Sequence, residues 1–195
     1  MYDGKYHLDF DGPGPLKSSS VYCNFTANPA TTTVETKDRS VEIIPFDSPR
    51  THSFKIQYIP SLEAAEALAR HSERCTQHIE FGCRKAKLLN VGGERLGFWV
   101  SADGVYQNYW GGAQPESESC ACGETNSCLD PNTKCNCDAE RDIWTKDEGV
   151  LNSTTLLPVE EVVFKGVVKP GEANYTVGSL HCSGLCGFLF LGYRQ

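Results

Sequence analysis

Alternating apolar and polar positions, which are typical of half-buried strands, dominate the first third of the chain. The segments "SVYCNF", "SVEIIPF" and "FKIQYI" are rich in β-branched and aromatic side chains. The run "DGPGP", which begins at Asp11, breaks the pattern with turn-forming residues. We therefore expect short β-strands in this region.

One segment instead follows the helical period. Ser61 fits an N-cap at the start of "SLEAAEALARHSERC". The following apolar positions fall on one helical face, at Leu62, Ala65, Leu68 and Ala69. The pattern predicts a helix over about residues 61–75, with Cys75 at its end.

The second half combines strands with long loops. "RLGFWVS" and "VYQNYWGG" flank the turn Ala102-Asp103-Gly104 and predict a hairpin. "LLPVEEVVFKGVV" predicts one long strand or a strand pair over residues 156–168. The acidic run over residues 138–149 predicts a solvated loop, since it lacks the residue order of an EF-hand calcium loop. The fold class that follows is α+β, β-dominant and rich in loops.

Aromatic side chains gather around the predicted hairpin. They could form a platform on which sugar rings stack, but alternating aromatics beside a turn more often pack into a core, and we favour the core. The residues concerned are Trp99, Tyr106, Tyr109, Trp110 and Trp144.

Ten cysteines against one methionine in 195 residues indicate an oxidising compartment. Three N-x-[ST] sequons, at Asn24, Asn152 and Asn174, agree with an extracellular glycoprotein. The formal charge of −7 and the lack of a long basic cluster argue against a nucleic-acid partner.

The two ends suggest part of a longer protein. "MYDGKYHLDF" has neither the basic start nor the apolar core of a secretion signal. "LCGFLFLGYRQ", residues 185–195, is apolar but has about half the length that a membrane-spanning helix needs. We expect the parent protein to be anchored in a membrane by a segment outside this chain.

Five cysteines crowd into "SCACGETNSCLDPNTKCNCD", which could be a metal site, a redox centre or a disulfide mesh. Zinc sites favour C-x2-4-C pairs, whereas the close pairs here are C-x-C, and no histidine lies between residues 79 and 180. No C-x-x-C redox motif and no H-E-x-x-H motif occurs, so redox catalysis is disfavoured and the histidines are expected to be ordinary surface or core residues. Disulfides that hold a loop with few apolar side chains are the favoured interpretation, and a zinc-binding protein is an alternative.

In order and spacing, several segments closely resemble the fibrinogen-like module of the contactin-associated proteins, the Caspr/neurexin IV family. They are "YHLDFDGPGPL", "HSERCTQHIEFGCRKAKLLN", "YWGGAQP", "CACGETNSCLDPNTKCNCDAERDIWTKDEGVL" and "LPVEEVVFKGV". The resemblance implies a fibrinogen-C-terminal-like domain over residues 1–184, truncated at its N-terminal side, and an unmatched tail over residues 185–195.

The family resemblance implies function by binding. Its members are membrane glycoproteins of neuronal and glial junctions, so it implies cell adhesion outside the cell, without catalysis. The implied partners are cell-surface glycoproteins such as contactin-like immunoglobulin proteins. A calcium-dependent fibrinogen-related lectin is the alternative.

A more distant resemblance to the C-propeptides of fibrillar collagens implies a disulfide between Cys83 and Cys182. In fibrinogen domains the cysteine that corresponds to Cys23 pairs with one further upstream, so that resemblance leaves Cys23 without a partner. Cys186 falls in the unmatched tail. The other six cysteines would form three further pairs, of open connectivity. They are Cys75, Cys120, Cys122, Cys128, Cys135 and Cys137.

The collagen resemblance also bears on calcium. "DFDGPGPLK" aligns with a calcium-binding loop of the collagen module, so that Asp9 and Asp11 fall on ligand positions. Lys17 takes the place of an acidic ligand, and its positive charge opposes a divalent cation. We therefore expect no cofactor, with a weak calcium site at Asp9 and Asp11 as the alternative.

Overall fold

The computed structural model describes residues 2–10, 14–37, 40–91 and 93–188. Its helices are α1 (Leu62–Arg70), α2 (Ala121–Glu124) and α3 (Leu185–Phe188), with 3-10 turns η1 (Cys137–Ala139) and η2 (Thr154–Leu156). The strands are β1 (Gly4–Leu8), β2 (Ser19–Asn24), β3 (Thr31–Thr36), β4 (Val41–Ile43), β5 (His52–Lys55), β6 (Tyr58–Ile59), β7 (Arg74–Arg84), β8 (Asn90–Val91), β9 (Glu94–Arg95), β10 (Gly97–Val100), β11 (Tyr106–Gln107), β12 (Thr145–Leu151), β13 (Glu161–Phe164) and β14 (Glu172–Ser183). Strands with one main helix and long loops confirm the β-dominant α+β class.

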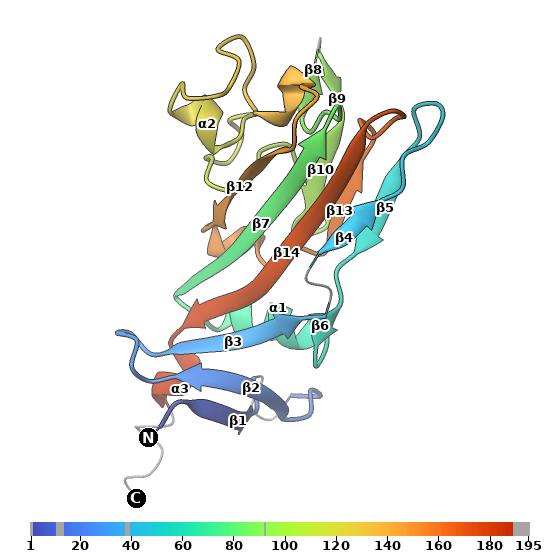
Figure 1. Ribbon diagram of the computed structural model, residues 1–195. Helices are drawn as coiled ribbons and strands as arrows, with labels where there is room; N and C mark the ends of the chain where they lie inside the picture. The colour runs from blue at the N-terminus through green and yellow to red at the C-terminus, as the bar shows by residue number, and fades with distance from the viewer. Residues whose placement is uncertain (1, 11–13, 38–39, 92, 189–195) are drawn as a thin grey trace, which may run out of the picture.

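Two long strands, β7 and β14, form the middle of the molecule (Figure 1). They belong to an eight-stranded sheet of order β1-β2-β3-β14-β7-β12, in which β4 also pairs with β14 and β6 with β3. A four-stranded sheet has the order β11-β10-β13-β5, and β8 pairs with β9 alone. Every pairing between these strands is antiparallel.

The core lies between the two main sheets. Phe81 of β7 packs against Phe164 of β13 with ring centroids 4.9 Å apart, and Tyr175 of β14 lies 5.7 Å from Phe164. Burying each of these rings contributes roughly 2 to 3 kcal/mol to folding. The sheets are therefore held face to face mainly by aromatic packing.

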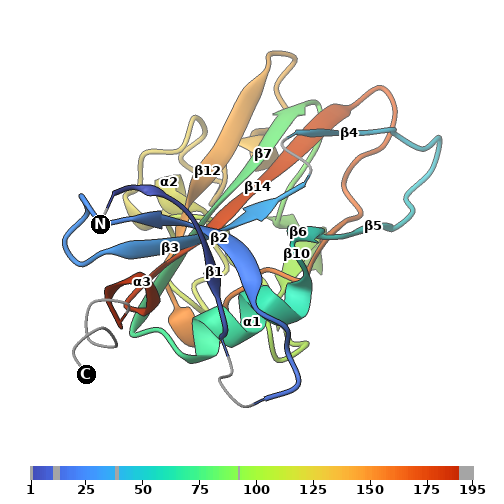
Figure 2. The same ribbon diagram turned by 90° about the horizontal axis from the view of Figure 1, so that it is seen from below.

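Helix α1 confirms the predicted start but not the predicted end. The Ser61 hydroxyl accepts a hydrogen bond from the Ala64 N–H at 3.2 Å, as an N-cap does. The helix stops at Arg70 instead of reaching residue 75. The reason is that apolar residues alternate with polar ones from Cys75 onward, so burial on the sheet favours strand β7 over another helical turn. Figure 2 shows α1 lying across the lower side of the molecule.

The hairpin prediction is confirmed, because Val100 of β10 pairs with Tyr106 of β11. The predicted strand over residues 156–168 shortens to β13, Glu161–Phe164. The prediction of a solvated acidic loop is wrong for its second half, where Thr145–Leu151 forms β12 at the edge of the large sheet.

The aromatic residues are divided between core and surface. Trp99 and Trp110 are fully buried, and each indole N–H donates to a backbone carbonyl, of Tyr109 at 2.9 Å and of Asp147 at 3.0 Å. The core interpretation is therefore confirmed for Trp99, Tyr109 and Trp110. It is wrong for Tyr106 and Trp144, whose exposed fractions are 67% and 53%.

The two ends of the described chain are linked. Cys23 of β2 forms a disulfide with Cys186 of α3, so the expectation that Cys23 lacks a partner is wrong. Buried Thr32 supports this link, because its hydroxyl accepts from the Cys186 N–H at 3.1 Å. The predicted domain boundary after residue 184 stays a prediction. Among the described residues, no helix combines the length and apolarity that a membrane crossing requires.

Candidate functional site

All ten cysteines are paired in five disulfides. The pairs are Cys23–Cys186, Cys75–Cys182, Cys83–Cys137, Cys120–Cys135 and Cys122–Cys128. No cysteine keeps a free thiol. The zinc-protein alternative therefore lacks its thiolate ligands, and the disulfide interpretation holds for the cysteine-rich segment.

The predicted disulfide Cys83–Cys182 is wrong, and the register between β7 and β14 explains why. In that ladder Cys182 lies opposite Cys75, whereas Cys83 lies opposite Ala173. At about 3.3 Å per residue, Cys75 and Cys83 are roughly 26 Å apart along β7. A disulfide requires Cα atoms within about 7 Å, so only Cys75 can reach Cys182.

Three disulfides organise the loop between β11 and β12, which we call the stapled loop (residues 108–144). Cys83–Cys137 fastens η1 to β7, while Cys120–Cys135 and Cys122–Cys128 close the loop upon itself around α2. After Tyr109 and Trp110, the loop buries no large apolar side chain, so covalent links replace the core that this part lacks.

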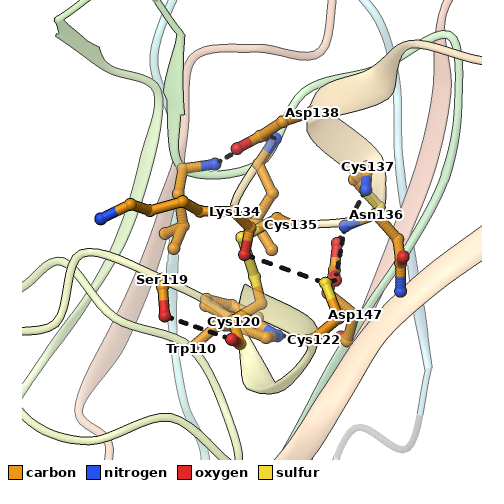
Figure 3. The surroundings of a disulfide bond; sticks show 12 residues. Trp110, Ser119, Cys120, Cys122, Lys134, Cys135, Asn136, Cys137, Asp138 and Asp147 are labelled. Atoms are coloured by element: carbon orange, nitrogen blue, oxygen red, sulfur yellow. Dashed lines mark hydrogen bonds between the residues drawn. A yellow bond between two sulfur atoms is a disulfide. The ribbon is translucent and has the colours of Figure 1, made fainter. Parts of the chain in front are cut away.

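A buried carboxylate, Asp147 of β12, supports the stapled loop from below (Figure 3). Its Oδ1 accepts from the Asn136 N–H at 2.9 Å, and its Oδ2 accepts from the Cys137 N–H at 2.8 Å. Burial raises the pKa of Asp147 to about 6, and the nearby Asp138 charge adds to the rise, although the two N–H donors oppose it.

Asp138 links the stapled loop to a second segment. Its Oδ1 accepts from the N–H groups of Leu88 and Leu89, at 2.8 and 3.1 Å, just beyond β7. The two buried aspartates thus anchor residues 136–138 on both sides. Such bonds satisfy backbone donors that would otherwise be buried without partners.

One group of side chains resembles a metal site in its spacing. The Sγ atoms of Cys120 and Cys135 and a carboxylate oxygen of Asp147 lie within 4.8 Å of one another. The two sulfurs are bonded to each other, and both Asp147 oxygens accept backbone N–H groups. We therefore assign this group a structural role.

Sequence reasoning missed Asp147, which it assigned to a solvated loop. The signal that could have found it is the alternation within "TKDEGVL", where Asp147 and Leu151 share the inward face while Lys146 and Glu148 point outward.

The stapled loop exposes apolar side chains. Leu129, Ile143 and Trp144 have exposed fractions of 44%, 55% and 53%. The Arg141 guanidinium donates to the Leu129 carbonyl at 2.7 Å, which links the part of the loop around Leu129 to the part that carries Ile143 and Trp144. Exposed aromatic and aliphatic side chains on a rigid support are typical of protein contact surfaces.

Only one of the two predicted calcium ligands lies in the described part of the chain. Asp9 is exposed just after β1, Lys17 is exposed before β2, and Asp11 lies outside the described residues. The weak calcium site therefore stays a prediction.

The three sequons lie in different surroundings. Asn152 is exposed after β12, whereas Asn24 is half-buried and its Oδ1 accepts from the Thr26 N–H at 3.0 Å. Asn174 is half-buried near the start of β14, opposite Gly82 of β7, and its carboxamide covers that glycine. Glycosylation at the three sequons is untested, and the structure favours Asn152, which is exposed, over Asn174.

Comparison with known proteins places the chain among cell-surface relatives. It is 40% identical over 188 residues to contactin-associated protein 1 of Rattus norvegicus, which covers 94% of this chain and 14% of the rat protein. The Mus musculus protein gives the same values. The Homo sapiens protein is 39% identical over 186 residues, which cover 93% of this chain and 13% of the human protein. The chain thus spans about one seventh of these relatives. No family model matches it.

Proposed function

Because the chain contains a domain of the contactin-associated protein family, we propose that it is an extracellular, non-catalytic protein-binding module of a cell-surface adhesion glycoprotein. The observation that carries the proposal is the similarity along 94% of the chain. Five disulfides agree with an extracellular location.

The proposed partners are contactin-like immunoglobulin proteins, because the similar proteins are contactin-associated proteins. The exposed apolar side chains of the stapled loop support a role in protein contact, since Trp is among the residues that most often dominate binding energy. A rigid, disulfide-closed loop loses little entropy on binding, which favours affinity.

A cell-binding experiment tests the proposal. The chain is secreted, labelled and applied to cells that display a contactin-like immunoglobulin protein and to matched cells that do not. We expect selective, saturable binding to the first. A Trp144→Ala variant should bind these cells more weakly. A Trp110→Phe variant, which changes the core instead of the surface, shows how far binding falls when only folding is weakened.

A glycan array, probed with and without a calcium chelator, distinguishes the lectin alternative. Calcium-dependent binding of a defined sugar, together with equal binding to both cell types, would contradict the proposed function and favour the lectin. A chain that binds neither cells nor glycans would instead act as a spacer between other domains.

A further inference from the structure

Several loops gather at the end of the molecule opposite β1 and α3 (Figure 1). Residues of these loops line a cleft of about 780 Å³. The β4–β5 loop contributes Pro49 to Thr51, and the β13–β14 loop contributes Lys165, Gly166 and the stretch from Val168 to Pro170. Residues just after β7 and η1, together with Glu94 and Leu96 around the end of β9, complete the lining. This volume is within the range of sites that bind small ligands or short peptide segments.

The charge of the cleft is opposite to that of the whole chain. The protein carries a formal charge of −7, yet five cationic side chains line the cleft against two carboxylates, Glu94 and Glu140. The cations are Arg50, Lys85, Lys87, Lys165 and Lys169. A concave cationic site on an acidic protein focuses a positive potential that attracts anionic groups.

Two of these cations are available to a ligand. Lys85, Lys87 and Lys169 pair with Asp142, Glu140 and Asp47 at 2.7, 2.8 and 3.0 Å. Among the described residues, Arg50 and Lys165 have no carboxylate at ion-pair distance. Each contacts an aromatic ring instead, Phe46 at 5.4 Å and Phe98 at 5.8 Å. Such contacts orient a cation without neutralising it.

The cleft is built rigidly from segments that are distant in sequence. The Lys165 N–H donates to the Leu96 carbonyl at 2.6 Å, and the Lys169 N–H donates to the Phe46 carbonyl at 2.9 Å. Gly166 permits the close approach of the Lys87 backbone, because a Cβ there would lie 2.4 Å from the Lys87 carbonyl oxygen. Cross-linked loops of this kind preorganise a binding site.

Backbone conformation also marks the cleft as unusual. Lys85 and Glu140 both have left-handed backbones, with φ of 53° and 49°. Residues other than glycine seldom adopt this region, and they do so at a free-energy cost that often accompanies binding sites. Here the conformation turns both side chains to the cleft, where each is held by an ion pair.

We infer that this cleft binds an acidic peptide segment of a partner protein, with Arg50 and Lys165 contacting its carboxylates. Apolar lining from Pro49, Leu96 and Pro170 provides contacts for apolar side chains between the acidic ones. A sulfated polysaccharide offers no such apolar groups, and the net charge of −7 on the whole chain opposes a dense polyanion. The inference rests on the proposed function, because it names the chemistry of the partner.

The test uses a random-peptide display library selected on the folded chain, so that its outcome does not depend on contactin-like proteins. We expect the selected peptides to be enriched in Asp and Glu interspersed with apolar residues. Their affinity should fall when the salt concentration is raised roughly tenfold, because screening weakens exposed charge pairs.

A charge reversal locates the site. Arg50→Glu combined with Lys165→Glu should weaken the selected peptides by about tenfold or more, as expected for loss of complementary charge. Lys55→Glu combined with Arg74→Glu makes the same charge change at exposed positions outside the cleft. This control should bind as the parent does, and equal thermal melting of both variants excludes unfolding.

Three outcomes overturn the inference. The first is that the selected peptides are neutral or basic. The second is that peptide affinity falls equally in the cleft variant and in its control. The third is that the chain prefers heparin and selects no peptide. Cell binding is measured separately from peptide binding. If the chain binds the selected peptides but does not bind cells that display a contactin-like protein, the proposed function is refuted and the cleft assignment stands.

Discussion

The disulfide between Cys75 and Cys182 joins two neighbouring strands at the centre of the fold, so its removal is a demanding test of the structure. Replacing both residues by alanine removes the link while the β7–β14 ladder, ten residue pairs in all, keeps its hydrogen bonds. Each cysteine is almost fully buried, and alanine fills most of the space that it vacates.

The magnitude follows from the length of the closed loop. For a separation of 107 residues the chain-entropy relation gives a loss of about 5 kcal/mol in the free energy of unfolding. With a urea m-value of about 2.5 kcal/mol per molar, the unfolding midpoint should fall by about 2 M. That loss is comparable with the whole stability of many domains.

A thiol titration under denaturing conditions separates the observed pairing from Cys83–Cys182. The Cys75→Ala, Cys182→Ala variant removes a complete pair and should show no free thiol. The matched Cys83→Ala, Cys182→Ala variant should release two, from Cys75 and Cys137. The reverse result would refute the register argument.

Peptide mapping gives an independent answer. Trypsin leaves Cys75 and Cys83 in one peptide, but cleavage after Glu80 separates them. We expect the Cys75 peptide to be linked to the Cys182 peptide. A peptide that links Cys83 to Cys182 in the unreduced parent would contradict the structure.

Three further results are expected. Burial raises the pKa of Asp147 from 3.8 to about 6, so the folded state favours the neutral carboxyl group. The neutral group contributes about 3 kcal/mol to stability at low pH, and this contribution is lost as the pH rises from about 4 to 6. Asp147→Asn should flatten that part of the stability profile in urea titrations, and an unchanged profile would contradict the assignment. In a secreted chain, Asn152→Gln should lower the measured mass by one glycan. Asn174→Gln should not, because Asn174 covers Gly82 within the sheet, and loss of a glycan in this variant would refute the difference. Calorimetry should detect no calcium binding tighter than about 0.1 mM, and saturable binding that disappears in Asp9→Ala would establish the calcium site.

Local patterns predicted much of the fold because they act through nearest neighbours. The Ser61 cap and the Asp103-Gly104 turn depend on a few consecutive residues, and both structures formed as expected. The end of α1 was not predicted, because helical and strand patterns overlap near Cys75. The alternation from Cys75 to Cys83 could have resolved it.

Long-range partners were beyond local reasoning. Cys182 faces Cys75 only because of the register in which β7 and β14 pair, including the shift between Val177 and Leu180, which no short motif specifies. The cationic cleft likewise joins Arg50 and Lys165 from loops more than a hundred residues apart in the chain. Its charges are scattered in the sequence, and only the fold gathers them.

The central claim is that this domain itself binds a protein partner, and surface plasmon resonance tests it most directly. A purified contactin-like ectodomain is passed over the immobilised chain, with reduced and alkylated chain as the reference surface. We expect saturable binding to the oxidised chain. This binding should be lost on reduction, because the stapled loop then has no covalent support. If the oxidised chain shows no saturable binding at ectodomain concentrations up to about 100 μM, any affinity is too weak to be of functional interest. That result would contradict the proposal that this domain binds the partner.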